Sequence, residues 1–294
     1  MRLTEASRRT FPTFGLLILG ALASPVWAAC KMPLPTPSLR LLDSRTDADP
    51  MAVDAEVNQR LAKLDGTDNL QWAELLAIQA EAASLMDNPS RVREAIAAGR
   101  QRLGQLSDEG IRGSLGFRMA LIEADSAVSP AELAAALANL TRLEPTLPAE
   151  SLQHACLLIM RSGVNRRLFH NDDSVRDGLL AHRLATEANA PSAAADTAFE
   201  LASTYLRAGL LVDAIGMADE VVHYSRSTHQ LGALAHGLQV KAWILAEMQR
   251  YEEALTATAE ARELNLQLHS AVDVTYADQG RCDVLLKMGR VDAA

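Results

Sequence analysis

From Ala52 onward, apolar residues recur at the spacing of one helix face, and short polar or glycine-containing breaks separate the runs. Prolines and capping residues begin several runs, as at Asn88-Pro89 and Ser129-Pro130, and glycines such as Gly209 end others. The pattern predicts helices over residues 51–64, 69–86, 90–104, 108–125, 130–143, 149–162, 174–188, 192–208, 212–226, 230–248, 252–267 and 271–288, with a further start at 291.

The helices fall into pairs that repeat along the chain. The small residue expected where the second helix of a pair crosses the first lies at Ala214, Ala254 and Ala294, with a spacing of 40 residues. The turns at Gly209, Gln249 and Gly289 keep the same spacing. Upstream, Ala95 and Ala135 are also 40 apart, and an irregular loop is expected over residues 163–173. A repeating pair that cannot bury its own apolar face must stack on its neighbours.

These residues resemble the tetratricopeptide repeat. The best unit carries the family's large and small residues in order at Leu201, Ala202, Tyr205, Gly209, Leu211 and Ala214. The next unit keeps Ala242, Leu245, Tyr251, Ala254 and Ala261, and the last keeps Leu285, Gly289, Val291 and Ala294. Ala198 and Leu238 stand where the family has Trp, its closing Pro is missing, and the period exceeds the usual 34 or so. The resemblance implies a right-handed α-solenoid of antiparallel helix pairs over 191–294, preceded by divergent helical repeats over 51–190.

Composition supports an all-α fold, since 49% of residues are hydrophobic but only 4% are aromatic. Ala and Leu therefore supply most of the apolar surface, and both favour helices. The formal net charge of −9 is opposite in sign to that of a nucleic-acid platform. Three widely spaced cysteines argue against a disulfide framework, and we expect Cys156 and Cys282 to be small buried helix residues. A single long-range bridge in an oxidising compartment is left open.

Residues 1–28 have the layout of an export signal. Basic residues are followed by the apolar run 14–23 and by small residues, and cleavage is expected after Ala28. The Arg8-Arg9 pair also resembles a twin-arginine signal, and the residues before Cys30 resemble a lipoprotein processing site, so both alternatives stay open. Residues 29–50, rich in proline, are expected to form an extended linker. The mature chain is thus expected to be periplasmic or otherwise exported, with no further membrane span in these residues.

No enzymatic motif is present: the chain lacks GxSxG, P-loop, GxGxxG and HExxH patterns. The seven histidines lie between 154 and 269 without metal-ligand spacing, so neither a metal nor a cofactor is expected. In the family that the chain resembles, the first helix of each pair lines a concave groove. Transferring those positions gives binding candidates Phe199, Ser203, Arg207, Gln239, Trp243, Glu247, Tyr276, Gln279, Asp283 and Lys287. Trp243 is the expected anchor, since aromatic residues dominate binding hot spots.

The leading interpretation is an exported scaffold that binds a protein or peptide in this groove. Similar exported repeats form the sensory region of bacterial GGDEF diguanylate cyclases and histidine kinases, so an output domain is expected beyond Ala294, where the last repeat is cut short. The alternative is a stand-alone periplasmic adaptor or assembly factor. Self-association of the repeats is left open by the sequence.

Overall fold

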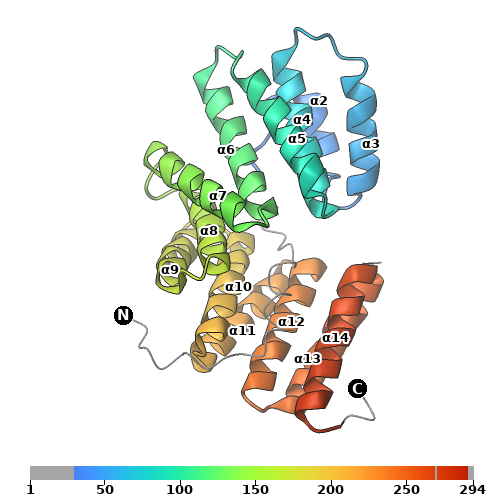
Figure 1. Ribbon diagram of the computed structural model, residues 1–294, viewed down its shortest axis with the longest axis vertical. Helices are drawn as coiled ribbons and strands as arrows, with labels where there is room; N and C mark the ends of the chain where they lie inside the picture. The colour runs from blue at the N-terminus through green and yellow to red at the C-terminus, as the bar shows by residue number, and fades with distance from the viewer. Residues whose placement is uncertain (1–29, 269, 291–294) are drawn as a thin grey trace. The chain divides into compact units, whose positions relative to one another are not determined.

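The computed structural model describes residues 30–268 and 270–290, and all the regular secondary structure in these residues is helical (Figure 1). The chain is all-α, as predicted, and its helices pack as consecutive antiparallel pairs. It divides into two compact units: unit 2 comprises Lys31–Leu147, and unit 1 comprises the chain from Pro148 together with Cys30. The sequence pattern predicts the boundary between divergent and regular repeats at residue 190 instead, because the first helix pair of unit 1 lacks the repeat's marker residues. The predicted signal and the marker Ala294 lie outside the described residues.

In the part of unit 1 that the structure describes, three helix pairs are followed by a single helix. Their bounds are α8 Leu152–Arg167, α9 Asn171–Glu187, α10 Pro191–Ala208, α11 Leu211–Ser227, α12 Leu231–Glu247, α13 Tyr251–Gln267 and α14 Ala271–Lys287. Helix α10 contacts α8 and α12, and α12 contacts α14, so we call these four the inner helices. The helices α9, α11 and α13 alternate with them along the chain and are called the outer helices (Figure 1).

One left-handed residue ends nearly every helix of unit 1, and these residues recur every 20 positions. They are Phe169, Asn189, Gly209, His229, Gln249 and Gly289, all with positive φ. After each one, the following backbone N–H donates back to the carbonyl five residues earlier, as Leu210 does to Tyr205 at 2.9 Å. This is the Schellman pattern, which satisfies the last carbonyls of a helix. The 40-residue repeat is therefore two 20-residue steps of helix and turn.

The expected irregular loop over 163–173 is shorter than predicted. Helix α8 continues through Gly163 to Arg167, and only Leu168 to His170 separate it from α9. A Cβ on Gly163 would lie 3.3 Å from the carboxyl group of Glu200 on α10. This glycine therefore lets two inner helices approach each other, whereas the sequence pattern treats it as a helix breaker.

The predicted crossing residues are at the centre of the packing. Ala214 and Ala254 are both completely buried, and Ala214 belongs to a core cluster that joins α10, α11 and α12 through Ala198, Val221 and Val240. Small side chains at these points let the helix axes approach closely. This confirms the packing role that the repeat predicts for the two alanines.

Unit 2 is built around a helix that is buried nearly all round. Its elements are α2 Pro37–Asp43, α3 Pro50–Leu61, α4 Asn69–Leu85, α5 Pro89–Leu103, α6 Glu109–Ser126, α7 Pro130–Leu143 and the short 3-10 turn Glu144–Thr146. Helix α4 contacts α2, α3, α5 and α6. Every residue of α4 from Ala73 to Ala83 is buried, including Glu74 and Glu81, which makes it the core of the unit.

The segment predicted as an extended linker is folded instead. Pro37 occupies the first turn of α2, and Leu34, Leu39 and Leu42 are buried. The backbone N–H of Thr36 donates to Glu74 Oε1 at 2.7 Å, which fixes the segment to α4. The prolines were interpreted as linker signals, but a proline in the first helical turn is favourable. Among the described helices, none is long and apolar enough to cross a bilayer.

Candidate functional site

A polar stripe follows the inner side of α10. Asp196, Glu200, Ser203 and Arg207 are spaced by four, three and four residues, which places them on one face of the helix. The other faces are occupied: Ala198 and Ala202 belong to the core cluster shared with α11, and Thr197 Oγ1 lies 2.9 Å from His182 Nδ1 on α9. The stripe is therefore turned away from the outer helices.

The 40-residue period extends this stripe across the next inner helices. Asp196, His236 and Tyr276 hold one position, Ser203, Trp243 and Asp283 a second, and Arg207, Glu247 and Lys287 a third. We call these three sets the inner rows. Each row places one residue at the same height on α10, α12 and α14 because the helices repeat with the same length and turn. The rows place mostly polar residues along three repeats, and of these Asp196 and Ser203 are buried.

Glu200 is paired across the first two inner helices. Arg166 on α8 donates from Nε to Glu200 Oε2 at 2.9 Å, and both side chains are almost completely buried. The missing side chain at Gly163 makes room for the carboxyl group. The pair is therefore a structural contact between repeats.

Arg207 has no carboxylate partner in the described part of the chain. Its guanidinium carbon lies 4.4 Å from the centre of the Phe169 ring, and its buried Nε makes no hydrogen bond. Burial, and then the nearby charge of Arg166, lower the pKa of Arg207 to about 10, so it stays protonated at neutral pH. The cation is held in place by an aromatic ring that is itself 68% exposed.

Asp196 and Ser203 also carry polar atoms without partners among the described residues. Asp196 is 5% exposed and its Oδ2 makes no hydrogen bond, while the hydroxyl of the fully buried Ser203 likewise has none. Burial first, and then the charge of Glu200, raise the pKa of Asp196 well above its ordinary value. Buried polar groups are normally hydrogen-bonded, so these two mark a place where a partner is missing.

The rows are more fully paired between α12 and α14. Lys287 forms an ion pair with Glu247, and His236 Nε2 lies 3.7 Å from Asp273 Oδ1. The hydrogen bond from His236 lowers the pKa of Asp273, whereas burial raises the pKa of Asp283. Arg207 and Asp196 on α10 thus lack charged partners, whereas Glu247 and His236, which hold the same row positions on α12, each have one.

The remaining binding candidates from the sequence lie beside the rows. Phe199 is buried in the core cluster with Val240 and Ile244, and Gln239 is buried next to Gly280 of α14. Gln279 is exposed at the equivalent position of α14. Trp243 is half-buried and packs against the core cluster. Their roles as ligand contacts stay predictions.

Two row residues were not among the candidates from the sequence. The sequence pattern does not single out Asp196, and the spacing of the histidines predicts an ordinary surface or groove histidine at His236. The signal that could have found them is the period itself, because Tyr276 was a candidate and counting back by 40 reaches His236 and then Asp196. In the described residues no cluster of His, Cys, Asp or Glu has the arrangement of a metal site.

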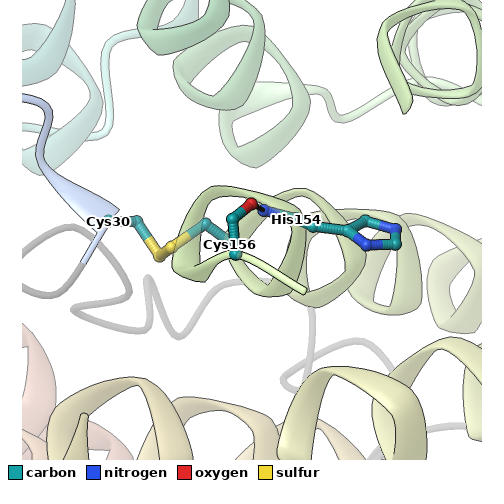
Figure 2. Close-up of a disulfide and its surroundings, with 4 residues drawn as sticks. Cys30, His154 and Cys156 are labelled. Atoms are coloured by element: carbon teal, nitrogen blue, oxygen red, sulfur yellow. Dashed lines mark hydrogen bonds between the residues drawn. A yellow bond between two sulfur atoms is a disulfide. The ribbon is translucent and has the colours of Figure 1, made fainter. Parts of the chain in front are cut away.

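Cys156 is disulfide-bonded, which corrects the expectation of a free buried cysteine. The bond joins Cys30 to Cys156 on α8 (Figure 2). The loop that it closes along the chain contains all of unit 2. Cys156 is buried, while Cys282 on α14 is half-buried and not disulfide-bonded. The long-range bridge that the sequence left open is therefore present.

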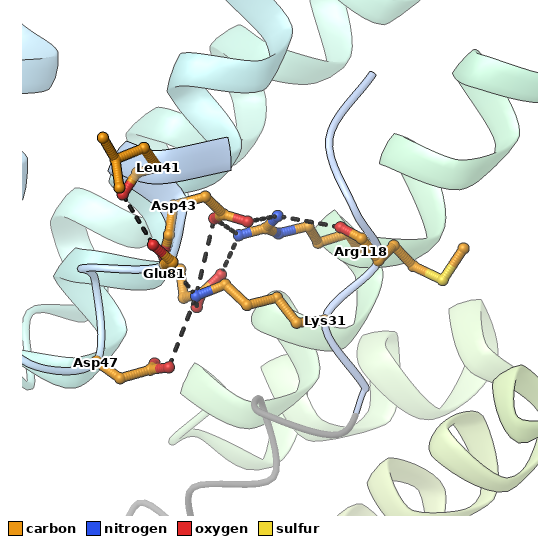
Figure 3. A network of polar contacts seen from close by, with 8 residues as sticks. Lys31, Leu41, Asp43, Asp47, Glu81 and Arg118 are labelled. Carbon is orange, nitrogen blue, oxygen red and sulfur yellow. Dashed lines mark hydrogen bonds and ion pairs between the residues drawn. The ribbon is translucent and has the colours of Figure 1, made fainter. Parts of the chain in front are cut away.

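A second buried charge cluster lies within unit 2. Arg118 on α6 forms ion pairs with Asp43 and Glu81, and Lys31 Nζ lies 2.6 Å from Glu81 Oε1 (Figure 3). Lys31 also donates to the carbonyl oxygen of Asp43 at 2.9 Å, and Asp47 lies at the edge of the cluster. The nearby carboxylates raise the pKa of Arg118 although burial opposes this. Each of the two cations is paired with carboxylates of unit 2 itself, so we interpret the cluster as structural.

These features define an all-helical repeat protein with a tetratricopeptide-like arrangement and a polar inner surface. No family model matches the sequence, and no curated protein matches it. Among solved structures, a Rap protein complexed with Competence and Sporulation Factor is similar over 92% of this chain and 74% of its own, with a TM-score of 0.65 and 12% identity. The apo form of RapI is similar over 87% and 72%, with a TM-score of 0.57 and 12% identity. These similarities show the fold.

Proposed function

We propose that the protein is an exported scaffold whose inner rows bind a protein or peptide. The observation that carries this proposal is the set of buried polar atoms without partners on α10, at Asp196, Ser203 and Arg207. Leaving such atoms unpaired costs roughly 1–3 kcal/mol each, so a ligand that pairs them gains affinity. The Rap structure complexed with Competence and Sporulation Factor gives a precedent for ligand binding by this fold.

Two features support export. The N-terminal residues have the layout of a signal with cleavage after Ala28. The disulfide between Cys30 and Cys156 fits an oxidising compartment. A sulfur of Cys30 that forms this disulfide cannot also carry a lipid thioether, so the bond favours a cleaved signal over the lipoprotein alternative. We therefore expect a mature protein that begins at Ala29.

Within this proposal the scaffold serves as the sensory region of a signalling protein of the diguanylate cyclase or histidine kinase type. The support is the order of an export signal followed by helical repeats. A downstream coding sequence with an apolar 20-residue span and a GGDEF-like motif is expected. A reading frame that closes directly after the repeats would favour the adaptor instead.

Binding is tested by panning a phage-displayed library of random linear peptides on the immobilised mature protein. Peptides recovered on the unmodified protein should also bind Val212→Ala, since Val212 is 78% exposed on the outer helix α11. They should lose binding to Trp243→Ala and to the double variant Glu247→Ala, Lys287→Ala, in which both members of an ion pair are removed together. Circular dichroism checks that each variant is folded.

Failure to enrich any peptide, or peptides that bind all of these variants equally, would refute the proposed binding function. Export is checked separately by purifying the protein from the envelope fraction and sequencing its N-terminus. Ala29 is expected as the first residue. An intact Met1 in the folded protein, with no material in the envelope fraction, would contradict export.

A further inference from the structure

The imidazole ring of His182 lies between three helices of unit 1. The residue belongs to the outer helix α9, and its side chain is 21% exposed. On one side of the ring, Nδ1 lies 2.9 Å from Thr197 Oγ1 on α10, and on the other, Nε2 lies 3.1 Å from Glu220 Oε2 on α11. One side chain therefore connects the helix pair α8–α9 with the pair α10–α11.

The hydrogen bond of Thr197 to the backbone decides where the ring carries its proton. Thr197 Oγ1 donates its hydrogen to the carbonyl oxygen of Ala194 at 2.8 Å. A hydroxyl group has one hydrogen and two lone pairs, so the same oxygen can only accept from His182. The proton in this contact must come from Nδ1. The His182 ring is therefore either the neutral Nδ1–H tautomer or the doubly protonated cation.

These two forms differ in their contact with Glu220. In the neutral Nδ1–H ring, Nε2 carries a lone pair that faces the carboxylate at 3.1 Å, and two acceptors at this distance repel each other. A second proton on Nε2 makes the ring a cation and turns the contact into an ion pair. Because histidine gains or loses its charge between pH 5 and 8, the sign of this contact depends on the pH in that range.

From this geometry we propose that His182 is a proton-operated clamp between the outer helices α9 and α11. Its imidazolium holds the two helices together in mildly acidic solution, and deprotonation at alkaline pH releases them. Within the described residues, the inner helices α8, α10 and α12 contact their neighbours directly, whereas successive outer helices come less close. A link on the outer side therefore acts on the rotation between repeats, from which the curvature of a solenoid follows. The proposal does not depend on the proposed binding function.

The following repeat has a similar link whose charge does not change with pH in this range. Glu260 on α13 lies 40 residues after Glu220, and its Oε1 lies 2.5 Å from Nη2 of Arg226 on α11. The two glutamate side chains are 40% and 42% exposed, so solvent screens both pairs to a similar extent. A guanidinium stays protonated throughout the range. The pair of Arg226 and Glu260 is therefore a matched control within the same unit.

Among the described residues, Glu220 is the charged group that faces the His182 ring. Other charged groups on α9 and on the helices around it have partners of their own: Arg161 with Asp177, Arg166 with Glu200, Arg176 with Asp173, Arg183 with Glu187, and Lys241 with Asp219. Two further titratable groups lie close along the chain. Asp196 precedes Thr197 but belongs to the inner rows, and the exposed His223 follows Glu220 by three residues. A double-mutant cycle cancels their contributions, since they are present in every variant.

The first test measures the coupling between His182 and Glu220 in the mature protein. His182→Ala, Glu220→Ala and the double variant are unfolded in urea at pH 5.5 and pH 8.5, and Arg226→Ala with Glu260→Ala forms the control cycle. At pH 5.5 we expect a coupling of about threefold in the equilibrium constant of unfolding, as for partly exposed ion pairs. At pH 8.5 this coupling should vanish or reverse. The control coupling should be the same at both pH values.

A second test locates the ring protons by nitrogen NMR of protein with labelled histidine. The signals of His182 are identified by their loss in His182→Gln and by their shift in Thr197→Val. Both ring nitrogens should be protonated at pH 5.5, and Nδ1 alone at pH 8.5, whereas a free imidazole side chain favours the proton on Nε2. Thr197→Val removes the acceptor and should abolish the preference for Nδ1.

The proposal is overturned if His182 and Glu220 show no coupling at pH 5.5, or the same coupling at both pH values. A neutral His182 ring with its proton on Nε2 would also overturn it. Neither result bears on the proposed binding function, which is tested by peptide selection. Circular dichroism at each pH shows whether a variant is folded, and the ring protons are measured in the unmodified protein, so this test stands even where an alanine variant unfolds.

Discussion

The two units differ in whether their buried charged side chains are paired. In unit 2, the charged groups of Arg118, Lys31, Asp43 and Glu81 form ion pairs with one another (Figure 3). In unit 1, Asp196 is equally buried but has no cation beside it. A buried charge that is paired stabilises a fold or is neutral, while an unpaired one weakens it. The difference teaches that the paired cluster of unit 2 stabilises its own fold, whereas the buried carboxylate of Asp196 has no such partner among the described residues.

The largest loss of stability should come from breaking the buried charge cluster of unit 2. Arg118→Met would leave the carboxylates of Asp43 and Glu81 with Lys31 alone, and a broken buried pair costs roughly 3–5 kcal/mol. Urea unfolding of the mature protein should show a loss of this size. Arg183→Met is the control, since its ion pair with Glu187 is half-exposed and worth under about 1 kcal/mol. Equal losses in the two variants would show that the cluster is not structural.

The disulfide should contribute next. It joins residues 126 positions apart, and its loop restricts the unfolded chain of unit 2. Replacing both cysteines, as in Cys30→Ser with Cys156→Ser, should lower the free energy of unfolding by about 2–4 kcal/mol. A reducing agent should lower the melting temperature of the unmodified protein but not that of the double variant. If it lowers both equally, the stabilisation does not come from this bond.

Removing the unpaired charge of Asp196 in unit 1 should have the opposite effect and stabilise the protein. Burial raises the pKa of Asp196, so its ionised form destabilises the fold. This penalty is absent below the unfolded pKa of about 4, grows as the pH rises above that value, and is complete once the pH exceeds the raised folded pKa. Asp196→Asn should therefore stabilise the unliganded protein at pH 7 by roughly 1–2 kcal/mol, and the gain should vanish near pH 4.

Melting temperatures measured between pH 4 and 7 check this prediction for Asp196. The control Asp172→Asn on the exposed side of α9 should change stability by less than about 0.5 kcal/mol across this range. A destabilised Asp196→Asn protein would show that the carboxylate is paired after all. A variant that gains stability while losing peptide binding would show the exchange of stability for function that is typical of binding sites.

Much of the fold could be predicted from the sequence because the helices are regular. The 40-residue period located the crossing alanines Ala214 and Ala254, and both are completely buried. The helix α2 was missed because its prolines also fit a linker, and only the burial of Leu39 against α4 distinguishes the two. Periodicity describes a helix and its repeats, and it is weak where an element occurs once.

The site was harder to predict than the fold. Phe199 and Glu200 are adjacent in the sequence, and successive helix residues point in directions about 100° apart. The rotation of α10 about its own axis therefore decides which of the two faces a neighbouring helix. That rotation depends on contacts such as Gly163 with Glu200, which no pattern in one chain reveals. The pairing of Cys30 with Cys156 was also beyond the sequence, because three cysteines allow three different pairs.

The smallest change in the free energy of unfolding should come from substitutions in the turns between helices, which lie outside the inner rows. Gln249 has a φ of 61° at the position where Gly209 has 74°. A side chain in this left-handed region costs about 1 kcal/mol. Gln249→Gly should raise the free energy of unfolding by about 0.5–1 kcal/mol, and Gly209→Ala should lower it by a similar amount, since a Cβ there meets no atom within 4 Å and only the backbone is strained. Urea unfolding measures both changes.

Peptide binding should be unaffected in both variants, because neither residue lies in the inner rows. A change in binding would show that the turns and the rows are coupled, and that the division between scaffold and binding surface within unit 1 is wrong.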